Sequence, residues 1–356
     1  MPRKHARLIA VAGLAASVAM IATQANAQDR VRWKMQSAFG STLIHLGPSG
    51  LRFAERIKEM SGGAFNIRFE EPGALVPALE AFDSVSKGAI ESAWTTPGYH
   101  TGKLGGAVSF FTAVPFGPQL GEYLAWKWFG GGQELRDELY AAHGATAVDC
   151  FCIGPETSGW FKEPIESMEQ IKGLKMRFFG LGAKVMQKMG ASTQLLAGAD
   201  IYPALERGVI DATEFSMPTI DIKLGFYQIA KNNYYPGWHQ QVSCSEFLMN
   251  KEMYEALPKA YQAMIKASAA EQVVYTYAET EALNPQAMME MLDKYGVTNR
   301  RWPDETLKTL EAAWIEVVEE ESAADPLFKK IAESFYSFRE VYRVWGEAQA
   351  LKSTYQ

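Results

Sequence analysis

Three charged residues of this chain have the side chains and the sequence surroundings of a small ionic binding site: Arg177, Glu214 and Glu156. Arg177 lies in a strand-like segment, residues 173–180, whose alternation puts it on one face with Phe179. A guanidinium beside aromatic rings is partly desolvated and needs an anion, and its planar fork matches a carboxylate with two hydrogen bonds. Periodicity alone favours a simpler alternative, a solvated arginine at a sheet edge.

The two glutamates each stand at the end of a strand-like apolar segment. Glu214 follows residues 210–213 and precedes Phe215, and Glu156 follows residues 153–155. Buried carboxylates are rare unless they are paired or bound to a metal. Two carboxylates and an amide would hold a hard cation such as Na⁺ or Ca²⁺ through oxygen alone. Considered singly, each glutamate is more simply an exposed loop acid.

Aromatic residues with polar tips gather in residues 233–240, Asn-Tyr-Tyr-Pro-Gly-Trp-His-Gln. Such side chains suit the wall of a pocket for a small polar ligand, and core packing is an equally good alternative. The histidines are scattered, and each one alone is more often a satisfied surface or core residue than a catalyst. They include His45, His100, His143 and His239.

Motifs of the common enzyme classes are absent from the sequence. It contains no GxSxG, no HExxH, no Walker-type GxxxxGK[ST] and no GxGxxG after a strand. The glycine run at residues 130–132 lacks the lysine and hydroxyl of a phosphate loop, so we interpret it as a turn. The sequence therefore favours a binding protein over an enzyme.

Composition places the chain among globular proteins. Its 356 residues are 47% hydrophobic and 21% charged, and this length predicts two domains. The formal net charge is -6 and no block of lysine and arginine interrupts the sequence after the leader. Nucleic acid is therefore not expected as a partner.

Residues 1–27 have the pattern of a signal peptide. A positively charged start is followed by an apolar stretch at residues 8–23 and by an Ala-Asn-Ala cleavage site at residues 25–27. No cysteine lies near that site, so a lipid anchor is not expected. We predict a soluble, exported, periplasmic protein.

Three cysteines remain in the exported chain: Cys150, Cys152 and Cys244. A bridge between Cys150 and Cys152 would be strained. Cys244 could pair with either one, because export permits disulfides. The preferred interpretation is three small buried apolar residues without a bridge.

Strand-like and helix-like segments alternate from residue 28 onward, which is typical of an α/β protein. The series at residues 31–95 reads β-α-β-α-β and predicts a mostly parallel sheet. A similar pattern recurs in residues 151–215. The two halves share a Pro-Ala-Leu-Glu segment, at residues 77–80 and 203–206, each followed by a glycine and a short strand. Ligands gather beyond the carboxyl ends of such strands, so two facing lobes predict a cleft.

The chain after about residue 250 is predicted to be helical. Residues 325–351 carry one broad aromatic stripe that includes Phe335, Phe338 and Trp345. Packing of this stripe on the chain's own lobes is the preferred interpretation. The alternative is a helix exchanged with, or docked on, a second copy in a homodimer.

Four segments together resemble the DctP-type solute receptors of tripartite ATP-independent periplasmic (TRAP) transporters, over essentially all of the mature chain. These segments are residues 173–177, 200–206, 210–214 and 234–238. They are most similar to the branch that binds 2-oxo and 2-hydroxy monocarboxylates, such as pyruvate or lactate, together with a cation. The resemblance implies a receptor without enzymatic activity that delivers its ligand to TRAP membrane subunits.

The resemblance also implies roles for single residues. Arg177 would bind the substrate carboxylate. The cation, Ca²⁺ or Na⁺, would be bound by Glu214, the main-chain carbonyl of Phe215, Glu156 and Gln240. The branch carries glutamine at the position of Glu156 and glutamate at the position of Gln240. These two residue types are exchanged in this chain, so the site still contains two carboxylates and one amide. Arg177 and a divalent cation would balance these carboxylates and that of the substrate, which favours Ca²⁺.

The predicted substrate contacts are Arg177, Glu156, Phe215, Tyr99, His100 and Trp238. Phe215 replaces the tryptophan usual in the branch, and the surroundings of Tyr99 and His100 are poorer in tyrosine. With Tyr234 and Trp238, Phe215 would wall a pocket for short acids. Two alternatives are a receptor for another organic anion, such as a sugar acid or an acidic dipeptide, and a cation-dependent exported hydrolase with Glu156 and Glu214 as acid and base.

The predicted architecture is a two-lobed α/β binding protein with a hinge, a ligand cleft between the lobes and long C-terminal helices. Residues 28–152 form lobe I, with a return segment at about residues 242–300. Residues 153–241 form lobe II. Residues 301–356 form helices that pack across the lobes or on a partner subunit.

Overall fold

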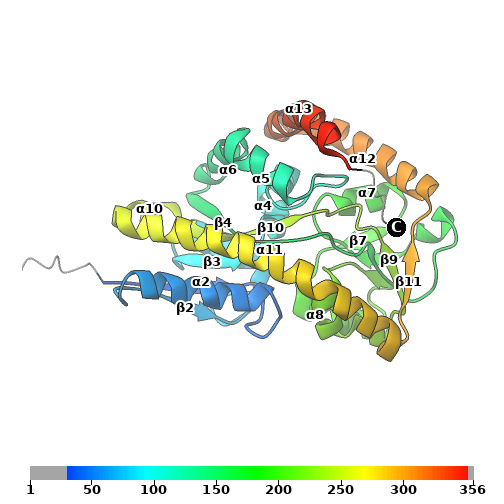
Figure 1. The fold of residues 1–356 in the computed structure, drawn as a ribbon, viewed down its shortest axis with the longest axis horizontal. Helices are drawn as coiled ribbons and strands as arrows, with labels where there is room; N and C mark the ends of the chain where they lie inside the picture. Colours follow the sequence, from blue (N-terminus) through cyan, green and yellow to red (C-terminus); the bar gives the residue numbers. More distant parts are fainter. Residues whose placement is uncertain (1–29, 352–356) are drawn as a thin grey trace, which may run out of the picture.

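The computed structural model describes residues 30–351, drawn in colour in Figure 1. The predicted signal peptide at residues 1–27 lies outside the described residues. Within residues 30–351, no helix is both long and apolar enough to cross a membrane.

A five-stranded mixed sheet forms the first lobe, in the order β2-β1-β3-β10-β4. Its strands are β1 (Val31–Ser37), β2 (Phe65–Glu70), β3 (Ser92–Thr95), β4 (Ala145–Ile153) and β10 (Ser243–Asn250). Strand β1 is parallel to both β2 and β3, as the β-α-β-α-β series predicted. Strand β10 returns from a distant part of the chain and runs antiparallel to β3 and β4.

Short helices connect the strands of this lobe. They are α2 (Leu46–Met60), η1 (Ala78–Glu80), α3 (Ala81–Ser86), η2 (Pro97–His100), α4 (Thr101–Leu104), η3 (Gly106–Phe111), α5 (Leu120–Phe129), α6 (Gly132–Ala141) and α10 (Lys251–Glu255). Gly47 lets the first turn of helix α2 approach the backbone of Gly40. A Cβ at Gly47 would lie 1.9 Å from the Gly40 carbonyl oxygen.

A six-stranded sheet forms the second lobe, in the order β11-β9-β5-β8-β6-β7. Its strands are β5 (Gly159–Phe161), β6 (Lys175–Arg177), β7 (Ser192–Gln194), β8 (Ala212–Thr213), β9 (Asn232–Tyr235) and β11 (Thr298–Arg301). Its helices are η4 (Met168–Ile171), α7 (Gly182–Lys188), α8 (Gly198–Glu206), α9 (Pro218–Leu224) and η5 (Phe226–Gln228). The strands are short, so most cleft residues lie on the segments that follow them.

Three segments join the lobes. The chain passes from β4 to β5 and from β9 back to β10, and helix α11 (Lys259–Tyr295) runs along both lobes in Figure 1. Helix α11 contacts β4 and α2 on one side and α9 on the other. The return segment predicted for residues 242–300 thus starts in the first sheet and ends in the second, where β11 pairs with β9. The two-lobed α/β architecture is confirmed.

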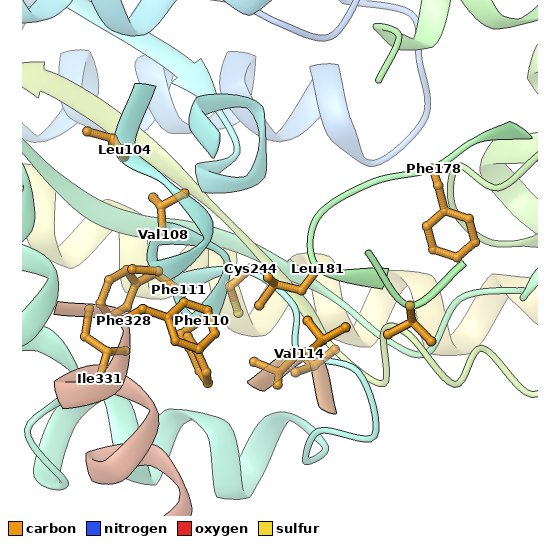
Figure 2. Close-up of a cluster of buried hydrophobic side chains, with 14 of the residues drawn as sticks. Leu104, Val108, Phe110, Phe111, Val114, Phe178, Leu181, Cys244, Phe328 and Ile331 are labelled. Atoms are coloured by element: carbon orange, nitrogen blue, oxygen red, sulfur yellow. The ribbon is translucent and has the colours of Figure 1, made fainter. Parts of the chain in front are cut away.

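The C-terminal helices α12 (Asp304–Ala324) and α13 (Pro326–Gln349) lie along the top of the molecule as drawn in Figure 1. Helix α12 packs on α7 of the second lobe, and α13 packs on η3 and α5 of the first. Figure 2 shows Phe328 and Ile331 of α13 beside Phe110 and Phe111. The aromatic stripe is buried as far as Phe335, whereas its last turns are exposed.

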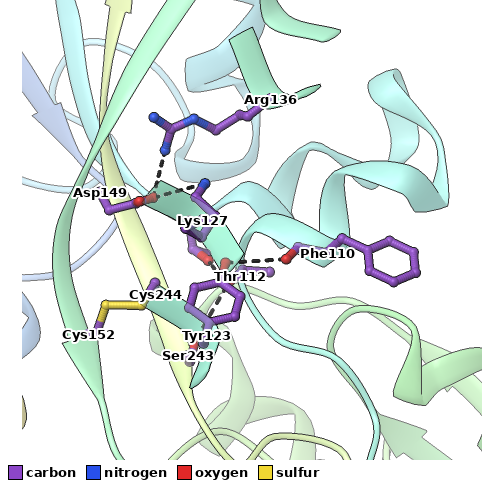
Figure 3. Close-up of a disulfide and its surroundings, with 10 residues drawn as sticks. Phe110, Thr112, Tyr123, Lys127, Arg136, Asp149, Cys152, Ser243 and Cys244 are labelled. Carbon is purple, nitrogen blue, oxygen red and sulfur yellow. Dashed lines mark hydrogen bonds and ion pairs between the residues drawn. A yellow bond between two sulfur atoms is a disulfide. The ribbon is translucent and has the colours of Figure 1, made fainter. Parts of the chain in front are cut away.

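A disulfide joins Cys152 to Cys244 (Figure 3). The two residues are register partners on the antiparallel strands β4 and β10. Cys150 is buried and has no partner among the described cysteines, because a break in the β4–β10 register skips it. The prediction of three unbridged cysteines is therefore wrong: strand pairing between distant segments, invisible in local patterns, brings Cys244 opposite Cys152.

Candidate functional site

A cavity of about 40 Å³, lined by buried residues, lies between the lobes. This volume has room for about three water molecules, or one very small ligand. Thr96 and Phe215, which follow β3 and β8, line it from opposite lobes, as expected for strand ends facing a cleft. The full lining is Phe39, Leu46, Thr96, Tyr99, Phe151, Ile153, Glu156, Arg177, Phe179, Phe215, Ser216, Gln240, Ser243 and Ser245.

Arg177, the last residue of β6, has only 1% of its surface exposed, so the alternative of a solvated edge arginine does not hold. Its Nη1 donates to the side chain and to the main-chain carbonyl of Glu214, both at 2.8 Å, and its Nε donates to the Leu196 carbonyl at 3.2 Å. The guanidinium lies 5.1 Å from the centre of the Phe215 ring and 5.9 Å from that of Phe179. A cationic group is thus fixed between aromatic walls.

Glu214 follows β8 and is fully buried. Its Oε1 accepts hydrogen bonds from Arg177 and from the main-chain N–H of Phe179 at 2.5 Å. Burial alone would raise the pKa of Glu214, but Arg177, His239 and the Phe179 N–H outweigh it and lower this pKa. The other oxygen, Oε2, is buried without a hydrogen-bond partner in the described chain. Glu214 therefore keeps one ionised oxygen available for a cation.

Glu156 follows β4, on the segment that leads from the first lobe to the second, and is 4% exposed. Its backbone N–H donates to the Gln240 carbonyl at 3.2 Å, which links the β4–β5 connection to the β9–β10 connection. Burial, supported by the negative charge of Glu214, raises the pKa of Glu156 to about 7, although His239 opposes this rise. Its Oε2 also has no hydrogen-bond partner among residues 30–351. A second carboxylate thus faces the same space.

His239, to which the sequence analysis assigned no role in the site, lies beside both glutamates. Its Nε2 lies 3.7 Å from Glu156 Oε2 and 3.6 Å from Glu214 Oε2. Burial lowers the pKa of His239, but the two glutamates outweigh burial and raise it to about 9. The available signal was its position beside Gln240, a residue already assigned to the cation.

These side chains fit a bound cation. Each of Glu156, Glu214 and His239 offers one ligand atom, and the three atoms lie within 4.8 Å of one another. Gln240 lines the same cavity, and its Oε1 is buried without a partner in the part of the chain that the structure describes. Such unsatisfied buried oxygens cost free energy unless a ligand completes them.

The structure brings Arg177, Glu156, Phe215, Tyr99, Glu214 and Gln240 together, with Glu214 joined through its contact to Arg177. Tyr99 contacts the Phe179 ring edge-on, at 5.8 Å between ring centres. Burial raises the pKa of Tyr99, which keeps its hydroxyl protonated and able to donate a hydrogen bond.

Two predicted substrate contacts lie outside the cavity. His100, the last residue of the 3₁₀ turn η2, directs its Nε2 to Glu246 at 3.1 Å and packs at a tilt against the Phe82 ring, so its side chain is held within the first lobe. Trp238 packs between Phe116 and Phe178. The placement of both residues is corrected accordingly.

Tyr234 likewise packs in the second lobe, 4.2 Å from the Trp302 ring centre. Phe215, Tyr99 and Phe179 form part of the cavity wall, and other parts of it come from residues that no local motif marked. These are the rings of Phe39 and Phe151 and the hydroxyls of Thr96, Ser216, Ser243 and Ser245.

The family model described as bacterial extracellular solute-binding protein, family 7 (DctP), matches residues 41–325. A "Monocarboxylate 2-oxoacid-binding periplasmic protein" of Nostoc sp. is 32% identical over 358 residues, covering 99% of this chain and 97% of that protein.

Solved structures of TRAP solute-binding proteins share the fold. A protein of Bordetella bronchiseptica with bound calcium and picolinate is 32% identical, with a TM-score of 0.88 over 90% of this chain and 95% of its own. One of Pseudoalteromonas atlantica with sodium and pyruvate is 31% identical, with a TM-score of 0.87 over 90% and 97%. One of Colwellia psychrerythraea with calcium and pyruvate is 31% identical, with a TM-score of 0.86 over 90% and 98%.

Proposed function

Because this chain belongs to family 7 of the bacterial extracellular solute-binding proteins, we propose that its cavity binds a small 2-oxo or 2-hydroxy monocarboxylate, such as pyruvate or lactate, together with a cation. The family consists of extracytoplasmic TRAP solute receptors, and the chain is such a receptor rather than an enzyme. The proposal concerns the ligand and the residues that hold it.

The observation that carries the proposal is the buried guanidinium of Arg177 in so small a cavity. A carboxylate is the small anion that its fork matches best. Phe179 and Phe215 line the cavity beside this guanidinium. The volume of about 40 Å³ therefore supports a short acid over a sugar acid or an acidic dipeptide.

The cation would lie among Glu156, Glu214 and Gln240, beside the substrate carboxylate. The main-chain carbonyl of Phe215 is the further ligand that we assign. With a neutral His239, a divalent ion and Arg177 together would balance two glutamates and one substrate carboxylate, which is the charge count for Ca²⁺; with a protonated His239, Na⁺ would complete the same balance. The cation and the acid would then bind cooperatively, because each neutralises charge that the other leaves buried.

Two partner assignments complete the proposal. We assign delivery of the ligand to TRAP membrane subunits, in accordance with the family. We also assign a homodimer formed through the end of α13, where Val341, Val344 and Trp345 are 75%, 73% and 59% exposed. A neighbouring structure of Bordetella bronchiseptica is a dimer. Light scattering on wild type and on Val341→Glu tests this assignment, which a monomeric wild type would contradict.

Calorimetric titration with pyruvate and lactate tests the ligand assignment, in buffers with and without Ca²⁺. Stoichiometric binding with unchanged acid recovered afterwards is the expected result. Galacturonate and an acidic dipeptide serve as controls for size. Tight binding of either control, without binding of pyruvate or lactate, would overturn the proposal.

A further inference from the structure

His239 lies beside both glutamates of the cavity, yet it forms no hydrogen bond with either one. Its Nε2 is 3.6 Å from Glu214 Oε2 and 3.7 Å from Glu156 Oε2. Both ring nitrogens and both of these oxygens are buried without a hydrogen-bond partner among residues 30–351. Buried imidazoles normally satisfy at least one nitrogen, so this arrangement requires an explanation.

A direct ion pair between His239 and a glutamate does not explain the spacing. Charge-assisted N–H···O contacts close to about 2.7–2.9 Å. Here Nε2 lies 3.7 Å from the Glu156 oxygen and 3.6 Å from the Glu214 oxygen, so both distances exceed that of a charge-assisted hydrogen bond. Two ligands of one ion, bonded at about 2.0–2.2 Å with a tetrahedral angle between them, lie about 3.3–3.6 Å apart. The observed distances of 3.6 and 3.7 Å lie at and just above the upper end of this range.

The ring of His239 is held in this position by its neighbours. It meets the Phe178 ring edge-on, at 5.0 Å between ring centres. On its other side, Gly182 begins helix α7, and a Cβ there would lie 2.9 Å from the Cβ of His239. The backbone of Gly182 therefore packs directly against this residue. Such packing fixes a ligand before its ion arrives.

We propose that Nε2 of His239 is itself a metal ligand, an inference that rests on the cation site of the proposed function. The site would then prefer a transition-metal dication such as Zn²⁺, Co²⁺ or Cu²⁺ to Ca²⁺ or Na⁺. Calcium takes oxygen ligands, whereas imidazole suits zinc, copper and their neighbours. Glu156, Glu214 and His239 together offer two oxygens and one nitrogen. Gln240 adds an amide oxygen at the same cavity.

The test uses untagged protein stripped of metal with EDTA and titrated, without any acid, with Co²⁺, Zn²⁺ or Ca²⁺ in a calorimeter. We expect Co²⁺ and Zn²⁺ to bind at least tenfold more tightly than Ca²⁺. In His239→Gln, an amide oxygen replaces the nitrogen, so this preference should fall at least tenfold while Ca²⁺ still binds. The control is His143→Gln, at an exposed histidine, which should retain the wild-type preference.

A second measurement needs no variant. Wild-type protein loaded with one equivalent of Cu²⁺ should show, in pulsed electron paramagnetic resonance, the modulation produced by the remote nitrogen of a bound imidazole. Absence of that modulation would overturn the proposal, as would Ca²⁺ binding as tightly as Co²⁺, or an unchanged Co²⁺ affinity in His239→Gln. Pyruvate titration of the Ca²⁺-loaded protein tests the proposed function separately, so the two failures are distinguishable.

Discussion

The Nη1 of Arg177 donates hydrogen bonds to two oxygens of Glu214, one on the side chain and one on the main chain, each at 2.8 Å. The two residues are brought together because β6 and β8 are parallel neighbours with Arg177 opposite Thr213. The group assigned to the anion therefore touches the group assigned to the cation. Changes in either residue should affect both binding events.

Replacement of Arg177 by methionine tests the anion site. We expect Arg177→Met to lower pyruvate affinity by roughly 100-fold, about 3 kcal/mol, because it removes the positive charge that would face the substrate carboxylate in a desolvated site. Calorimetry in Ca²⁺ buffer measures this loss. The control, Arg207→Met, removes an exposed arginine of the same lobe and should bind normally. Near-normal binding by Arg177→Met would rule out the assignment.

Removal of the cation should also weaken pyruvate binding. We expect at least a tenfold loss in chelated buffer, reversed when Ca²⁺ is added back, because two buried carboxylates then face the substrate carboxylate without compensation. Glu214→Gln keeps the shape of the side chain but removes its charge, so its affinity should respond less to chelation. Glu206→Gln, at an exposed glutamate, is the control. Full affinity of wild type in metal-free buffer would remove the cation from the proposal.

The size of the cavity depends on a close approach between Gly98 and Phe179. A Cβ at Gly98 would lie 2.1 Å from Cζ of Phe179. Gly98→Ala should therefore displace this ring and reduce pyruvate affinity at least tenfold. Gly102→Ala is the matched control, because no atom of the described chain lies within 4 Å of a Cβ there. Equal affinities of both variants and wild type would contradict the idea that Phe179 limits the cavity.

Local patterns predicted those parts of the site that depend on one strand and its end. Arg177 and Glu214 fall in this class, since strand alternation and an acid at a strand end were both visible in the sequence. The orientation of His100 and of His239 depends on the turns that carry them and on packing against distant segments of the same lobe, which include Phe82 for His100 and Phe178 for His239. The pairing of Cys152 with Cys244 depends on β10 entering the first sheet beside β4. Neither kind of information is contained in residue spacing.

The Cys152–Cys244 disulfide links the neighbouring strands β4 and β10. The next residues, Ile153 and Ser243, line the cavity. It closes a sequence separation of 92 residues. Reduction should therefore lower the free energy of unfolding by about 4.6 kcal/mol, the loop-closure entropy of a loop of this length. Denaturant titration with and without reductant measures this change. The control Cys150→Ala should respond to reductant like wild type, and the double variant Cys152→Ser/Cys244→Ser should not respond. Equal stability of oxidised and reduced wild type would contradict the prediction.

A buried lysine gives a pH dependence of stability that can be assigned to one group. Lys127 is fully buried, its Nζ lies 3.4 Å from Asp149, and Arg136 binds the same carboxylate at 2.6 Å (Figure 3). Burial, supported by the positive charge of Arg136, lowers the pKa of Lys127 from 10.5 to about 8, although Asp149 opposes this fall. Between these two values the unfolded chain binds more protons than the folded protein, so this group makes unfolding more costly as pH rises.

Between pH 7 and pH 9.5, Lys127 should therefore increase the free energy of unfolding by about 2 kcal/mol, as linkage gives for these two pKa values. Other groups titrate in the same range, so the quantity to measure is the difference between wild type and Lys127→Met in denaturant titrations across that range. The variant should lack this rise and should gain stability relative to wild type at pH 7, where the buried ammonium is most costly. Lys87→Met, at an exposed lysine, should retain the wild-type profile. Parallel profiles of wild type and Lys127→Met would show that Lys127 is charged equally in the folded and unfolded chains over this range.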